Sequence, residues 1–136
     1  MICTYCGDTA DSLDHFIPHS YAQKNGEPKS FARSKTIPAC RECNCILGTR
    51  LFYSIGERAA YLKDRYLSRY KKILSTPEWD DEELEDMGYN MRMLIETSQE
   101  DKRAIQYRVA HCETVAAVSP TPEEVWAAHD ERLASI

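Results

Sequence analysis

The sequence predicts an α+β fold, in which a small cysteine-rich unit at the N-terminus precedes a mainly helical C-terminal part. Three observations predict this arrangement. Two Cys-x-x-Cys pairs lie within the first 43 residues. No helical periodicity is visible before about Arg41, whereas from Ser54 onward apolar residues recur every three or four positions between capping signals. We therefore expect two parts, residues 1–52 and residues 53–136.

The N-terminal part is expected to contain a hairpin and one short helix. Residues 24–30 carry strong turn signals, Asn25-Gly26 above all. This turn predicts a strand near residues 12–17 and a second strand near residues 35–38. A helix should then begin at the pair Cys40 and Cys43 and end near Gly48. A unit of this size has little apolar core, so a bound metal is the usual replacement.

The first long helix is predicted over about residues 55–74. Ser54 and Glu57 have the spacing of a capping box, and Pro77 lies just past the far end. The expected apolar face consists of Ile55, Ala59, Leu62, Tyr66, Tyr70 and Ile73. A basic stripe is expected on another face, formed by Arg58, Arg65, Arg69 and Lys72. Such a stripe is more often solvated surface than a binding site.

The remaining residues predict acidic helices over about residues 77–134. Thr76, followed by proline, has the form of a cap with proline at the first helical position, leading into residues 80–86. Gly88 is expected to end or bend that helix. A further helix is expected to begin after Ser98, and Thr121 is expected to cap a last helix ending near Leu133.

The charge of the chain is unevenly distributed. The formal net charge is −5, but residues 1–75 carry 12 Lys and Arg against 7 Asp and Glu, whereas residues 76–136 carry 5 against 15. Any phosphate-binding face should therefore lie in the first half, although charge alone also allows two solvated surfaces. No run reaches the roughly 18 apolar residues of a membrane span, and the first residues resemble no secretory leader. We expect a cytoplasmic protein.

The two cysteine pairs, Cys3 with Cys6 and Cys40 with Cys43, predict one structural zinc ion. Zinc takes four ligands at tetrahedral corners, and each Cys-x-x-Cys turn presents two thiolates to one ion. In a reducing compartment paired cysteines are metal ligands more often than disulfides, though disulfide or redox use stays open. Cys45 and Cys112 are interpreted as free or buried thiols.

The residues between and after these pairs carry a family pattern. Asp14-His15 is followed by Pro18 and Ser20, and Asn44 stands directly after Cys43. Together with the cysteine pairs, this arrangement resembles the zinc-containing HNH endonucleases over residues 3 to about 50. The resemblance implies a ββα-metal unit on a treble-clef zinc site. It also implies a metal-dependent DNA endonuclease that nicks or cleaves by phosphodiester hydrolysis, in a bacterial cell or a phage-infected host.

The resemblance assigns roles to three residues. It implies that His15 is the general base and that Asp14 and Asn44 hold a catalytic Mg²⁺ or Mn²⁺. The chemistry agrees, because histidine titrates near neutral pH, and hard cations take carboxylate and amide oxygens. Each residue also has a simpler interpretation. Asp14 could be a turn or cap residue, His15 a hydrogen-bonded histidine or a zinc ligand, and Asn44 a helix cap.

The expected partner is DNA, with a protein partner or self-association through the acidic helical half. Backbone contacts are expected from basic residues of the first half, because Lys and Arg supply sequence-independent affinity. The candidates are Lys29, Arg33, Lys35, Arg41 and Arg50. Lys35 stands where the family usually has a middle asparagine. That departure favours the alternative, a treble-clef zinc module that binds DNA or a protein without catalysis.

Overall fold

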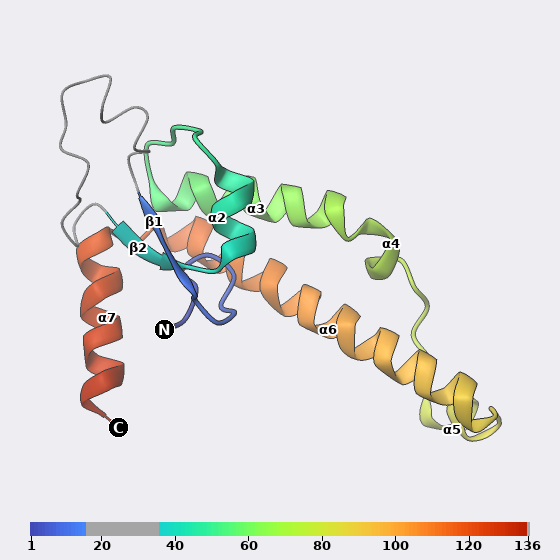
Figure 1. Cartoon of the computed structure of the whole chain (residues 1–136). Coiled ribbons are helices and arrows are strands. Elements are labelled where there is room, and N and C mark those ends of the chain that lie inside the picture. The colour runs from blue at the N-terminus through green and yellow to red at the C-terminus, as the bar shows by residue number, and fades with distance from the viewer. Residues whose placement is uncertain (16–35, 136) are drawn as a thin grey trace.

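The computed structural model describes residues 1–15 and 36–135, and it is mainly helical with one small sheet (Figure 1). The elements, in chain order, are β1 (Ser12–His15), β2 (Thr36–Ala39), α2 (Arg41–Leu47), α3 (Ile55–Arg69), α4 (Lys71–Leu74), α5 (Asp81–Glu85), α6 (Tyr89–Val118) and α7 (Pro122–Ala134). A small sheet unit followed by helices is the α+β order that the sequence predicts.

The two strands form the predicted hairpin. β1 pairs with β2 in antiparallel register, with Ser12 opposite Ala39 and His15 opposite Thr36. The turn predicted at residues 24–30 falls outside the described residues. Ahead of β1, the first cysteine pair lies in a tight turn that closes when the Gly7 amide donates to the Cys3 carbonyl over 3.0 Å. Gly7 has φ of +79°, a left-handed conformation that glycine adopts without a Cβ penalty.

The second cysteine pair opens α2, as predicted. The Sγ of Cys40 caps the helix by accepting from the amide of Cys43 over 3.4 Å. Gly48 ends the helix with φ of +54°, and its amide donates to the Asn44 carbonyl. Both cysteines of this pair and Leu47 are buried. The start of the helix therefore directs Cys40 and Cys43 to the interior of the molecule, whereas Cys45, two residues further on, is exposed.

The predicted helix over 55–74 is two helices in the structure. Ser54 caps α3 by accepting from the Glu57 amide, and Glu57 accepts in turn from the Tyr53 amide. The helix is interrupted at Tyr70, and the next residues form the single turn of α4. The predicted basic stripe is wrong at Arg58, which is fully buried. Arg58 follows Ile55 by one turn and therefore lies on the apolar face of α3.

Two predicted helix starts in the acidic half are wrong. Thr76 does not cap a helix; its hydroxyl donates back to the Ile73 carbonyl, and Asp80 caps α5 instead. No helix begins at Ser98, because α6 runs through it from Tyr89 to Val118 without Gly or Pro. Gly88, predicted to end or bend a helix, is the N-terminal flanking residue of α6. The cap at Thr121 is confirmed, since its hydroxyl accepts from the Glu124 amide at the start of α7.

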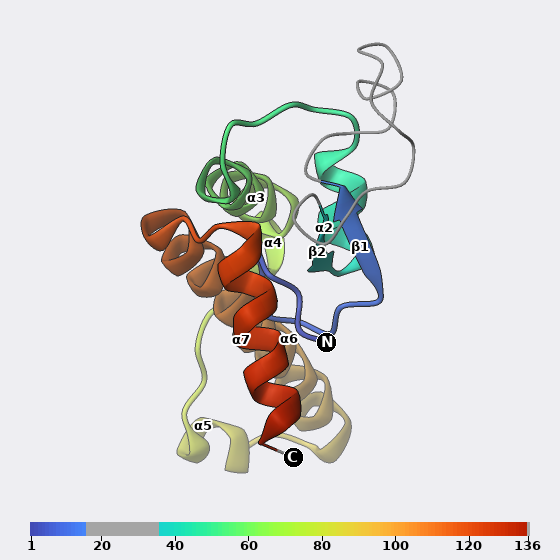
Figure 2. The same ribbon diagram turned by 90° about the vertical axis from the view of Figure 1, so that its left-hand side faces the viewer.

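The helices surround the small sheet unit on several sides. α3 packs along α6, α7 contacts β2, and the α5 end of α6 extends away from the sheet (Figures 1 and 2). One buried cluster joins residues 1–52 with residues 53–136. Its members are Cys3, Tyr5, Cys6, Ala10, Ile37, Ala39, Cys40, Cys43, Leu47, Ile55, Ala59, Leu62, Tyr66, Cys112 and Val115. Among the described helices, none has the length and apolar character that a membrane crossing requires.

Candidate metal centre and the predicted catalytic residues

The four predicted zinc ligands come together in the structure. The sulfur atoms of Cys3, Cys6, Cys40 and Cys43 all lie within 4.8 Å of one another, and all four residues are buried. Tetrahedral zinc with Zn–S bonds of about 2.3 Å separates its sulfur ligands by roughly 3.8 Å. The Sγ atoms of Cys6 and Cys40 are 3.7 Å apart, whereas a disulfide needs about 2.05 Å. This cluster could therefore hold a metal ion such as zinc.

The pKa values of the four thiols are shifted in opposite directions. Hydrogen bonding with Cys3 lowers the pKa of the Cys6 thiol to about 7, and it lowers the pKa of Cys40 as well. The pKa of Cys3 is raised through its hydrogen bond with Cys40, and that of Cys43 through its hydrogen bond with Cys3. Four thiolates this close repel one another in a buried site. All four can ionise together when a bound cation neutralises their charge.

Two polar side chains from the helical half lie against the cluster. The hydroxyl of Tyr66, on α3, is 2.8 Å from the Sγ of Cys43. Arg108, on α6, donates from Nη2 to the Tyr66 hydroxyl over 2.9 Å, and the same nitrogen lies 4.0 Å from the Sγ of Cys40. Nη1 of Arg108 pairs with Glu42 of α2 at 2.9 Å. The cysteine sulfur atoms are therefore contacted by Tyr66 and Arg108, which lie far from them in the sequence.

Asn44 lies beside the strand that carries the other two predicted catalytic residues. Its Nδ2 donates to the Leu13 carbonyl over 3.3 Å and to the Ser12 hydroxyl over 3.4 Å. Asn44 does not cap α2, because Cys40 occupies that position. The side chain instead ties α2 to β1, and it is half-buried. This places the third residue of the family pattern next to the chain segment that contains the first two.

Asp14 points into the interior of the molecule, where a buried arginine holds it. It is only 2% exposed, and Arg58 binds it through Nε at 3.1 Å and Nη2 at 3.0 Å, both to Oδ2. The Tyr5 hydroxyl also donates to Oδ2. Burial raises the pKa of the Asp14 carboxyl, and the charge of Arg58 opposes that rise. The described contacts therefore give Asp14 the role of a buried ion-pair partner.

His15 is the last residue of β1 and is half-buried. Its carbonyl oxygen lies 3.5 Å from Nη2 of Arg58, so the backbone of the predicted base is tied to the same arginine as Asp14. The three predicted catalytic residues thus occupy neighbouring positions on β1 and α2. Residues 16–35, which hold Pro18 and Ser20 of the family pattern, are outside the described part of the chain.

Two of the five predicted DNA-contacting residues can be placed. Arg41 is exposed at the start of α2, and Arg50 is exposed after it, with its guanidinium 5.2 Å from the ring centre of Tyr61. Lys29, Arg33 and Lys35 lie outside the described residues. Arg65, Arg69 and Lys72 of the predicted stripe are exposed on α3 and α4, and Arg69 lies 3.3 Å from Glu42.

Sequence reasoning missed four residues that surround the site: Tyr5, Arg58, Tyr66 and Arg108. A signal was available for Arg58, since a charged residue on the same helical face as Ile55 and Leu62 must find a buried partner. Tyr66 lies on the predicted apolar face, and its hydroxyl is a second signal, because a buried tyrosine hydroxyl needs a hydrogen-bond partner. Arg108 and Tyr5 carry no comparable local signal.

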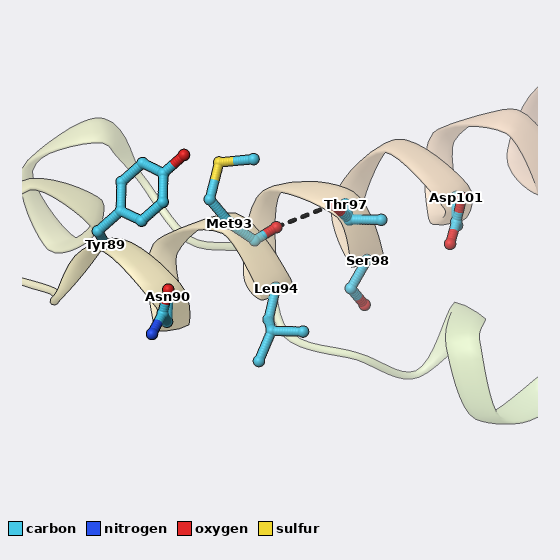
Figure 3. A pocket seen from close by; sticks show the side chains of 7 residues that line it. All are labelled: Tyr89, Asn90, Met93, Leu94, Thr97, Ser98 and Asp101. Atoms are coloured by element: carbon cyan, nitrogen blue, oxygen red, sulfur yellow. Dashed lines mark hydrogen bonds between the residues drawn. The ribbon is translucent and has the colours of Figure 1, made fainter.

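A separate hollow lies on the exposed part of α6, far along the chain from the cysteines. It has a volume of about 650 Å³, and Figure 3 shows its lining side chains, which all come from this helix. They are Tyr89, Asn90, Met93, Leu94, Thr97, Ser98 and Asp101. Tyr89 and Leu94 are largely exposed. The predicted partner surface of the helical half thus includes exposed apolar side chains.

No family model, curated protein or solved structure matches this chain.

Proposed function

We propose that this chain is a zinc-stabilised, metal-dependent DNA endonuclease of HNH type. Zn²⁺ is the structural ion of Cys3, Cys6, Cys40 and Cys43, and His15 is the general base. The observation that carries the proposal is the contact between Asn44 and β1, with Nδ2 of Asn44 3.3 Å from the Leu13 carbonyl. This contact brings Asn44, the residue after the second cysteine pair, beside the strand that ends with Asp14 and His15.

The chemistry assigned to each residue follows from its donor atoms. Cysteine thiolates suit zinc, and oxygen atoms suit a hard cation, so two kinds of metal ligand serve two purposes. Asn44 would offer its amide oxygen to Mg²⁺ or Mn²⁺, which would neutralise charge on the phosphate, and Asp14 would join it only by releasing Arg58 from its carboxylate. His15 is the proposed acceptor of the proton of the attacking water, because imidazole is the side chain most often used as a general base. A zinc ion held by the four cysteines would tie α2 to the turn before β1 and so keep these residues in place.

DNA is the proposed substrate, bound in part through exposed basic residues. Arg41 and Arg50 are exposed on the α2 side of the molecule, and phosphate contacts from such residues give affinity without sequence preference. The proposed location is the cytoplasm of a bacterial or phage-infected cell. The acidic helical half serves as a scaffold or as a surface for a protein partner or a second copy.

The test is plasmid nicking with Mg²⁺ or Mn²⁺ by protein of verified zinc content. We expect wild type to convert supercoiled DNA in a metal-dependent manner, and His15→Ala to be at least about 100-fold slower, because general-base catalysis contributes about that factor or more. His129→Ala, in α7, is the matched control and should cut at the wild-type rate. Equal cutting by wild type and His15→Ala would show that the cleavage has another source.

A second candidate function is a zinc module that binds nucleic acid or protein without catalysis. The observation that favours it is the burial of Asp14 against Arg58, with only 2% of the Asp14 residue exposed. A carboxylate held in this way already has a cation, so a metal would have to compete with the guanidinium.

The two candidates predict different results for the same protein preparations. The binding module should shift the mobility of DNA fragments or retain a partner while no form of DNA is cut at any Mg²⁺ or Mn²⁺ concentration. His15→Ala should then bind as wild type does. Loss of folding on zinc removal is expected from both candidates and does not separate them.

A further inference from the structure

We propose that Tyr66 and Arg108 belong to the metal centre as hydrogen-bond donors to its sulfur atoms, so that the helical half of the chain sets how tightly the thiolates hold zinc. The inference rests on the proposed binding of zinc by the four cysteines. It extends that proposal by adding two residues, on α3 and α6, to a site whose ligands all lie in residues 3–43.

The direction of the hydrogen bonds follows from the chemistry of the ligands. A zinc-bound cysteine is a thiolate and can only accept, so the Tyr66 hydroxyl donates to the Sγ of Cys43 across their 2.8 Å separation. The Tyr66 oxygen itself accepts from Nη2 of Arg108 at 2.9 Å. A donor that also accepts from a cation is polarised and donates more strongly.

The net charge of the zinc-bound site also favours a nearby positively charged side chain. Four thiolates around Zn²⁺ carry a net charge of about −2, which is costly in a buried site without nearby positive charge. The Arg108 side chain is 12% exposed and lies against Cys40, with Glu42 holding its other nitrogen at 2.9 Å. Glu42 stands between the two cysteines of the second pair, so the turn that binds the metal also orients the arginine.

Conservative substitutions test the contribution of each donor. Tyr66→Phe removes the hydroxyl alone, and Arg108→Lys keeps the charge but loses the forked donor. Removing a partner of a metal ligand typically costs about 10–100-fold in metal affinity. We therefore expect Tyr66→Phe to raise the zinc dissociation constant at least about 10-fold in competition with a chromophoric chelator. Tyr61→Phe on α3 and Arg103→Met on α6, which touch no cysteine sulfur by the described contacts, should leave the constant unchanged.

Cobalt-loaded protein supplies a readout that a purely structural role would not move. A hydrogen bond lowers the energy of the sulfur lone pairs, so its loss should shift the sulfur-to-cobalt charge-transfer band of Tyr66→Phe and Arg108→Lys to longer wavelength. Alkylation of the thiolates should also become faster in these variants, because they are stronger nucleophiles without the donors.

The outcomes separate the inference from the proposal beneath it. If wild type binds zinc with one ion per chain but Tyr66→Phe matches it in affinity, band position and alkylation rate, the donor role is wrong while the zinc site stands. If wild type binds no zinc, both are overturned. Nuclease activity enters neither comparison, so failure of the catalytic proposal leaves this result unaffected.

Discussion

At the scale of single residues, the buried pair of Asp14 and Arg58 has the clearest energetic consequence. Both side chains are almost fully buried, and two nitrogens of the guanidinium contact the carboxylate. A buried ion pair adds little folding stability compared with two apolar residues of similar size. Loss of one partner, however, leaves an uncompensated buried charge and is strongly destabilising. The pair joins β1 to α3, and therefore residues 1–52 to residues 53–136.

The first prediction concerns the removal of one member of this pair. Arg58→Met should lower the free energy of unfolding by about 3–5 kcal/mol, measured by urea denaturation. Burial already raises the pKa of Asp14, and without Arg58 the rise is larger. A raised pKa in the folded state means that stability is lost as pH rises through it. The deficit of the variant should therefore be largest at neutral pH and should shrink as Asp14 becomes protonated in acid.

Two controls accompany this measurement. Arg65→Met changes an exposed arginine of the same helix and should alter stability by no more than about 0.5 kcal/mol. The double variant Asp14→Leu with Arg58→Met removes both charges and should recover most of the loss. A double variant as unstable as Arg58→Met alone would show that the arginine acts through packing rather than through its charge.

At the scale of elements, the turn that carries Cys3 and Cys6 packs closely against α6 at Gly7. A Cβ added to Gly7 would lie 2.8 Å from Cδ2 of His111, closer than real contacts allow. The imidazole Nδ1 of His111 also lies 3.1 Å from the Tyr5 carbonyl oxygen. α6 therefore packs directly against the turn that carries Cys3 and Cys6.

Gly7→Ala should consequently destabilise the protein for two separable reasons, the positive φ of +79° and the contact with His111. A non-glycine residue in the left-handed region costs of the order of 1 kcal/mol by itself. We expect a larger loss in thermal denaturation, and partial recovery when His111→Ala is added. If Gly88→Ala, where a Cβ meets nothing within 4 Å, destabilises as much, the argument from close packing is wrong.

The helix starts show which capping patterns in the sequence predict the structure and which do not. The caps at Ser54 and Thr121 and the start of α2 could be predicted, because each depends on residues within a few positions of one another. The start at Ser98 was wrong because a capping pattern cannot interrupt a helix that packing favours. Two side chains of α6 near Ser98 contact the segment before α5: Lys102 donates to the Thr76 carbonyl over 2.7 Å, and Gln99 donates to the Trp79 carbonyl over 3.3 Å. The partners in these contacts are 26 and 20 residues apart in the chain.

At the scale of the whole molecule, metal removal should affect both parts together. The cysteines share one buried cluster with α3 and α6, and Trp126 of α7 donates to the Thr36 carbonyl of β2. We expect a chelator to lower the melting temperature in a single transition seen by both circular dichroism and tryptophan fluorescence. Because zinc displaces protons from thiols, the stabilisation by zinc should weaken as pH falls. Unchanged tryptophan melting in chelator would indicate that the helical half folds independently.

The cysteine cluster, the two strands and α2 could be predicted from the sequence, because the spacing of each cysteine pair and the start of α2 depend on residues close together in the chain. The pairing of Asp14 with Arg58 spans 44 residues and that of Arg58 with Tyr5 spans 53. No pattern within one chain segment specifies such contacts. The outer contacts of the cysteine cluster depend in the same way on the packing of α3 against α6.

The distance along the chain between Cys43 and Arg108 has a consequence for biosynthesis. Arg108 is the 65th residue after Cys43, so at 5–20 residues per second a ribosome adds it about 3–13 s later. During that interval the four thiols are already made while α6, which covers them, is not. A metal ion that binds during this interval would therefore reach the thiols before α6 packs against them, and oxidants would reach them in the same way. In the finished structure Arg108 of α6 lies against Cys40, so the helix restricts access that the nascent chain leaves open.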